Sequence, residues 1–108
     1  MNDPQFVEAA RVFAERVVAD GGASPEQRLT FAFRLSTSRA PNGAELAILK
    51  AEFDDRIRAF KANPERAVAY LNGGGVRKPN PEIDPPELAA YAAVCSLILN
   101  LDESISTN

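Results

Sequence analysis

The sequence of 108 residues contains no histidine and a single cysteine. Without histidine the chain lacks the usual general base, the commonest zinc and haem ligand, and the usual partner of a nucleophilic serine or cysteine. A single cysteine, Cys95, excludes an internal disulfide, a zinc knuckle and a CxxCH haem attachment. Because Cys95 lies in the apolar run 92–98, we expect a small buried side chain there and no reactive thiol. The sequence therefore predicts no metal site and no cofactor.

Basic charge and long apolar runs are scarce as well. The formal net charge is −3, so no basic surface indicates a nucleic-acid partner. No segment reaches the roughly 20 apolar residues that a membrane span requires. The longest, 88–101, includes Ser96 and Asn100. No stretch alternates convincingly between apolar and polar residues, which makes β-strands unexpected.

Prolines and capping residues mark where helices begin. A side chain that can cap a helix precedes a proline four times, in Asp3–Pro4, Ser24–Pro25, Asn63–Pro64 and Asp84–Pro85. The capping oxygen accepts a hydrogen bond from a free backbone N–H. Proline suits the first helical position because it has no backbone N–H, and an N–H at that position would have no acceptor within the helix. Gln27 and Glu87, three residues after Ser24 and Asp84, predict two capping boxes. Asn42 with Glu45 marks a fifth start, without proline.

Apolar residues recur at helical spacing after these starts, in stripes within 6–17, 29–33, 46–60 and 67–71. The last segment, 85–100, has almost no polar face, and a helix that is apolar on all sides is expected to be surrounded by others. The sequence therefore predicts a single all-α domain over residues 1–108. We expect about five helices bundled around an apolar C-terminal helix, and a frayed tail at 104–108.

Three glycines at 73–75, followed by Arg77 and Lys78, could suggest a phosphate-binding loop. Such a loop leads from a strand into a helix N-terminus, where free N–H groups meet the anion. Here the glycines follow a helix, at the end with free carbonyls. We interpret 73–83 as a connector between two helices.

The acidic residues form no obvious catalytic or metal constellation. Glu52, Asp54 and Asp55 lie near Arg56 and Arg58 at helical spacing, which predicts ion pairs on a solvated face. The acidic residues at 82, 84 and 87 lack the spaced ligand loop of a calcium site. We therefore predict no catalytic residues in this chain.

Charged residues at the ends of apolar helices form the predicted partner surface. An ion pair from Arg34 or Arg39 to Asp102 or Glu103 would join the second helix to the last. The connector residues Arg77 and Lys78 belong to the same hypothesis. The predicted surface thus comprises Arg34, Arg39, Arg77, Lys78, Asp102 and Glu103.

Several short segments resemble a known family in order and spacing: Asn2–Ala10, Ala32–Leu35, Ser38–Pro41, Glu45–Leu46 and Leu99–Glu103. Together they look like the C-terminal part of a domain of unknown function found in large planctomycete proteins. Those proteins typically join it to a cytochrome c-like segment and a second uncharacterised domain. The resemblance implies that this chain is a piece of a longer exported protein. It brings no established activity and no catalytic residues.

Three hypotheses about function follow. The first is a non-catalytic packing or interaction module whose partners are other domains of a larger protein, and whose isolated form could pair with a second copy. The second is a fragment that completes the active site of a parent enzyme, acting on polysaccharide or in electron transfer. It would supply Asp102, Glu103 or the arginines to the cleft of that enzyme. The third is a free-standing cytoplasmic helical adaptor.

Overall fold

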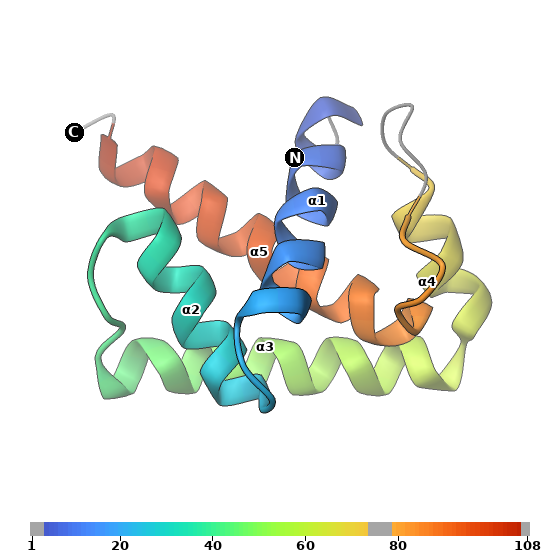
Figure 1. Ribbon diagram of the computed structural model, residues 1–108, viewed down its shortest axis with the longest axis horizontal. Helices are drawn as coiled ribbons and strands as arrows, with labels where there is room; N and C mark the ends of the chain where they lie inside the picture. The colour runs from blue at the N-terminus through green and yellow to red at the C-terminus, as the bar shows by residue number, and fades with distance from the viewer. Residues whose placement is uncertain (1–3, 74–78, 107–108) are drawn as a thin grey trace.

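The structure is a computed structural model that describes residues 4–73 and 79–106, with side chains from 8 to 101 within these ranges. The described residues form five α-helices and no strand, which confirms the predicted all-α class. The helices are α1 Pro4–Asp20, α2 Pro25–Thr37, α3 Gly43–Ala62, α4 Pro64–Leu71 and α5 Pro85–Ser106 (Figure 1).

The C-terminal helix α5 is the central element of the fold. It contacts all four of the other helices, and in Figure 1 it crosses the middle of the molecule behind α1. Every side chain from Leu88 to Cys95 is buried, as is Ile98. Since eight consecutive residues span more than two turns, burial extends around the whole helix. The prediction of an apolar helix enclosed by the others is confirmed.

The remaining helices turn one apolar face toward α5. The buried side chains on these faces are Ala10, Ala14 and Val17 in α1, Leu29, Ala32 and Phe33 in α2, Leu49, Phe53 and Phe60 in α3, and Ala67 and Leu71 in α4. They coincide with the stripes that the spacing predicts. Val68 is an exception, since 43% of its surface is exposed.

Two helix starts carry complete capping boxes. The Gln27 N–H donates to Ser24 Oγ at 3.2 Å, and the Ser24 N–H donates to Gln27 Oε1 at 3.2 Å. At α3 the Glu45 N–H donates to Asn42 Oδ1 at 2.8 Å, and the Asn42 N–H donates to Glu45 Oε1 at 2.9 Å. Local sequence thus determines where α2 and α3 begin.

Two other predicted caps differ in detail. The side chain of Asn63 makes no capping hydrogen bond. Asn63 also ends α3, donating its N–H to the Ala59 carbonyl, and it lacks the extended backbone of Ser24. At α5 the Glu87 N–H donates to Asp84 Oδ2 at 3.4 Å, but the Glu87 carboxylate pairs with Arg28. The reciprocal half of the predicted box is therefore replaced by a tertiary contact.

The last helix is longer than predicted. It continues to Ser106, past the end expected at residue 100, so the tail predicted from residue 104 is helical over its first part. The cap predicted at Asp3 lies outside the described residues. Within the described ranges, no helix is both long enough and apolar enough to cross a membrane.

Candidate interaction surface

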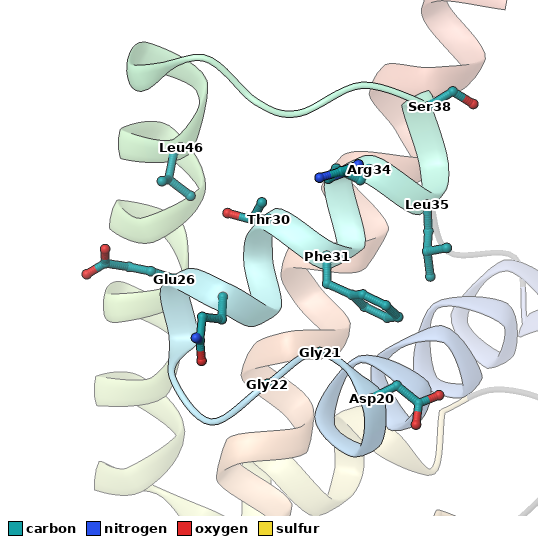
Figure 2. Close-up of a pocket in the computed structure, with 11 residues that line it drawn as sticks. Asp20, Gly21, Gly22, Glu26, Thr30, Phe31, Arg34, Leu35, Ser38 and Leu46 are labelled. Carbon is teal, nitrogen blue, oxygen red and sulfur yellow. The ribbon is translucent and has the colours of Figure 1, made fainter.

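A groove of about 860 Å³ runs along the outer side of α2 and is open to solvent (Figure 2). The turn after α1 forms one wall, and Leu46 of α3 forms the other. Phe31 and Leu35 of α2 supply apolar surface between the walls, and both project toward the end of α1 in Figure 2. Leu35 is 43% exposed, which is high for a leucine next to a core helix.

Two glycines shape the corner between α1 and α2. The Gly21 N–H donates to the Val17 carbonyl at 2.8 Å, and a Cβ on Gly21 would lie 2.5 Å from that same oxygen. Gly22 has a φ of 108°, in the region that favours glycine. The chain can therefore reverse closely enough for α2 to pack beside α1, and this turn forms one wall of the groove.

Three residues of α2 lie in one row along the side of the groove that faces α3 (Figure 2). Glu26, Thr30 and Arg34 are spaced at i, i+4 and i+8, which places them one above another. Glu26 lies in the first turn and Arg34 in the last, where each charge complements the helix dipole. Both are exposed, and no ion pair joins either of them to another described residue.

A second hollow, of about 380 Å³, adjoins the groove because both include Leu35. Its other lining residues are Phe13, Arg16, Ser36 and Leu99. The hydroxyl of Ser36 is buried and has no hydrogen-bond partner among the described residues. Apolar surface thus extends from the groove toward the C-terminal part of α5.

Arg39, part of the predicted partner surface, is engaged within its own chain. Its guanidinium makes two hydrogen bonds to Glu45, at 2.8 and 2.7 Å, and lies 5.0 Å from the centre of the Phe33 ring. The bonds from Arg39 and from the Asn42 N–H lower the pKa of Glu45 to about 2. Arg39 therefore joins the end of α2 to the start of α3, a contact that the sequence reasoning missed.

The structure describes only some of the other residues of the predicted partner surface. Arg34 lines the groove. The backbone of Asp102 and Glu103 belongs to α5, but their side chains lie outside those described, so an ion pair from Arg34 to either stays a prediction. Arg77 and Lys78 lie outside the described residues altogether.

A contact between α2 and α5 was not predicted. Arg28 Nη1 donates to Glu87 Oε1 at 2.9 Å and to the Tyr91 hydroxyl at 3.4 Å, while its Nε donates to the Gly22 carbonyl at 3.0 Å. The bond to Tyr91, together with the charge of Glu87, raises the pKa of Arg28. Burial raises the pKa of Tyr91, whose ring packs against Phe53 at a centroid distance of 4.5 Å. No local spacing could reveal this contact, because Arg28 and Glu87 are 59 residues apart.

Arg11 is a second unpredicted residue, with a side chain that is only 1% exposed. It lies between Glu8 at 3.6 Å and Glu15 at 3.5 Å, and Glu15 also accepts the Asn80 N–H at 2.8 Å. Acidic residues at i−3 and i+4 were a visible signal for ion pairing. They gave no indication that the arginine would be buried, since burial depends on how the helices pack against one another.

The acidic residues of α3 pair as the spacing predicts, with bridges from Glu52 to Arg56 and from Asp55 to Arg58. Asp54 pairs with Lys50. In the described part of the chain, no three acidic or cysteine side chains are grouped so that they could hold a metal ion. Burial raises the pKa of Cys95, as expected for an unreactive thiol.

A smaller apolar crevice, of about 420 Å³, lies between α4 and the connector before α5. Its lining includes Val68, Leu71, Ile83 and Leu88, and it explains why Val68 is exposed. Asn72 and Pro79 also line it.

Comparison of the chain with protein-family models, with curated proteins and with solved structures finds no match. The geometry of the groove is therefore the main basis for a proposal about function. Apolar side chains beside exposed charges of both signs suit contact with another protein surface.

Proposed function

We propose that this chain is a non-catalytic helical interaction module of a larger exported protein, in which it packs against other segments of the same protein. The observation that carries the proposal is the groove on α2. Phe31 and Leu35 line its side toward α1, and Glu26 and Arg34 line its side toward α3. Protein interfaces commonly combine an apolar centre with a polar rim.

Charged groups elsewhere support a structural role for most of the surface. Glu45, Glu52 and Glu87 are engaged in ion pairs with Arg39, Arg56 and Arg28. These contacts join neighbouring helices or stabilise a single helix. Glu26 and Arg34 in the groove differ, because no ion pair joins either of them to another described residue.

The suggestion of a larger exported protein comes from the resemblance of the segments 2–10, 32–35, 38–41, 45–46 and 99–103 to the planctomycete domain. Such a domain would contact neighbouring segments of its own protein through surfaces like the groove. Reading the gene upstream of the Met1 codon tests this directly. We expect the reading frame to continue upstream, and a stop codon immediately before Met1 would contradict the proposal.

Binding to the upstream segment is the second test. The segment is expressed as a separate polypeptide, and its affinity for this chain is measured by calorimetry. We expect Leu35→Asp to weaken binding at least about tenfold, because it places a charge in the apolar centre of the interface. Val68→Asp is a matched control, since Leu35 and Val68 are each 43% exposed.

The control variant should bind as the unaltered chain does, because Val68 lies on α4, away from the groove. Equal binding by the Leu35→Asp variant, with helicity and melting temperature preserved, would show that the groove is not the interface. If Leu35→Asp and Val68→Asp weakened binding equally, the groove would likewise not be the interface.

A further inference from the structure

The dipeptide Asn–Gly occurs twice in the sequence, as Asn42–Gly43 and as Asn72–Gly73. Glycine has no side chain that would keep its backbone nitrogen away from the carboxamide of the preceding asparagine. The nitrogen can therefore attack the carboxamide carbon and close a succinimide ring. Both pairs are exposed, so access to water does not distinguish them. Asn63 and Asn80 precede prolines, which have no backbone N–H for this reaction.

We propose that Asn72 is a site of spontaneous deamidation in the folded chain, whereas hydrogen bonds at the start of α3 protect Asn42. In the first step the Gly73 nitrogen forms a bond to Asn72 Cγ, and the bond from Cγ to the side-chain nitrogen breaks. That nitrogen leaves as ammonia and takes the proton of the Gly73 N–H. Water then adds to one of the two ring carbonyls and opens the ring to aspartate or isoaspartate. The reaction consumes one water, releases one ammonia and needs no oxidant or reductant.

Three hydrogen bonds hold Asn42 in place. Its Oδ1 accepts the Glu45 N–H at 2.8 Å, its carbonyl accepts the Leu46 N–H at 2.9 Å, and its own N–H donates to Glu45 Oε1 at 2.9 Å. Ring closure requires rotation about the Cα–C bond until the Gly43 nitrogen lies beside Cγ. This rotation moves the carbonyl away from Leu46, and the attack moves the carboxamide away from the Glu45 N–H. A Cβ on Gly43 would meet nothing within 4 Å, so hydrogen bonds protect Asn42 and crowding does not.

Asn72 is held less firmly at the end of α4. Its N–H donates to the Val68 carbonyl at 3.0 Å, and rotation about the Cα–C bond leaves this bond intact. Among the described residues, that rotation breaks only the long bond from the Gly73 N–H to the Tyr70 carbonyl, at 3.3 Å. The side chain of Asn72 makes no hydrogen bond to a described residue. The Gly73 nitrogen can therefore reach the carboxamide while α4 stays folded.

The product changes the charge at this end of α4. Asn72 lines the apolar crevice beside Val68 and Leu71, and either product places a carboxylate there. A negative charge at the C-terminal end of a helix is unfavourable, because the free carbonyls already carry partial negative charge. The inference does not rest on the proposed function, since the reaction needs only this chain and water.

Mass spectrometry of tryptic peptides tests the inference. Cleavage after Lys and Arg separates the two sites into peptides 40–50 and 67–77, each with one asparagine. The chain is kept in mildly alkaline buffer, and the deamidated fraction of each peptide is followed over time. In the folded chain we expect Asn72 to react at least about fivefold faster than Asn42, the factor that one helix cap supplies. In urea, where the cap is lost, the two rates should be about equal.

Glu45→Ala tests the cause of the protection. The substitution removes the acceptor of the Asn42 N–H, so it should raise the rate at Asn42 severalfold and leave the rate at Asn72 unchanged. Glu52→Ala is the matched control, because Glu52 lies on the same helix and pairs with Arg56. This control should change neither rate, and circular dichroism verifies that both variants remain folded.

Two results would overturn the inference. One is a folded chain in which Asn42 reacts as fast as Asn72 or faster. The other is a rate at Asn42 that Glu45→Ala leaves unchanged, because the capping box would then not be the source of the protection.

Discussion

Helices α5 and α2 differ in how much of their surface is buried. On α5 every residue from Leu88 to Cys95 is buried, so the helix has no free side over more than two turns. On α2 the residues Leu29, Ala32 and Phe33 are buried, whereas the opposite side lines an open groove. The difference separates a helix that holds the fold together from a helix that can serve both the fold and a partner.

The largest expected effect is at the buried helix. Ile98→Ala removes a side chain that is 0% exposed, in a part of α5 surrounded by other helices. The lost apolar contacts and the remaining cavity should lower the free energy of unfolding by about 2–5 kcal/mol. Urea denaturation followed by circular dichroism measures the change. A loss below about 1 kcal/mol would mean that α5 is less tightly enclosed than the structure shows.

The second largest effect on stability is expected at Arg28, which joins α2 to α5. Arg28→Met keeps much of the side-chain volume but removes the bonds to Glu87, Tyr91 and the Gly22 carbonyl. Since Arg28 is 18% exposed and Glu87 is partly screened by water, we expect a loss of about 1–2 kcal/mol. Arg16→Met is the control, because its pair with Asp20 is exposed and should contribute little. If both variants lost the same free energy of unfolding, the bonds of Arg28 to α5 would contribute no more than an exposed ion pair does.

The start of α2 allows a comparison of two caps. Ser24→Ala removes the side chain that accepts the Gln27 N–H and should cost about 1 kcal/mol. Asn63→Ala removes a side chain that makes no capping hydrogen bond, and it should cost clearly less. Thermal unfolding of both variants checks the difference. If the two losses were equal, the capping box at Ser24 would not be stabilising α2.

The ion pair between Arg39 and Glu45 predicts that the free energy of unfolding depends on pH. The expected change is smaller than the effects of the substitutions above. The pKa of Glu45 falls from an ordinary 4.5 to about 2 in the folded chain, owing first to Arg39 and then to the Asn42 N–H. The ionised form is favoured in the folded state, so this contribution is fully present above about pH 4.5 and is lost as the pH falls through about 2. Between these limits the unaltered chain should lose more stability than Glu45→Gln. Urea denaturation at several pH values provides the measurement, and parallel losses would contradict the assignment.

The smallest effect on stability is expected on the open side of α2. Leu35→Ala shortens a side chain that is 43% exposed, and it should change the free energy of unfolding by less than about 1 kcal/mol. Alanine also favours the helix slightly more than leucine does. Thermal unfolding compares this variant with Ile98→Ala. A similar loss at both positions would show that the two helices are equally enclosed, which would abolish the contrast between α2 and α5.

Much of the fold was predictable because the signals are local. A capping oxygen and its N–H partner are three residues apart, so the starts of α2 and α3 follow from Ser24, Gln27, Asn42 and Glu45. The central place of α5 followed from its composition, since an apolar surface on all sides must be covered on all sides. The end of α5 was predicted too early because residues beyond 100 carry no strong stop signal, and helix ends are weakly encoded.

The candidate site was less predictable. Arg34 was singled out from its charge at the end of an apolar helix, and its role in a partner surface stays a prediction; the groove around it is made in part by Leu46 and by the turn after α1. Arg39 makes two hydrogen bonds to Glu45, a partner that the sequence reasoning did not name. Ion-pair choice depends on how the helices are placed in space, which charge alone does not specify.

The sequence by itself determined the helical class, most helix starts and the helix that lies at the centre, because each depends on interactions within a few residues or on the composition of one segment. Only the tertiary structure decided that Arg28 meets Glu87 and Tyr91, that Arg11 is buried, and that one side of α2 stays open. These contacts join residues far apart in the chain, and their free energy depends on the packing of whole helices.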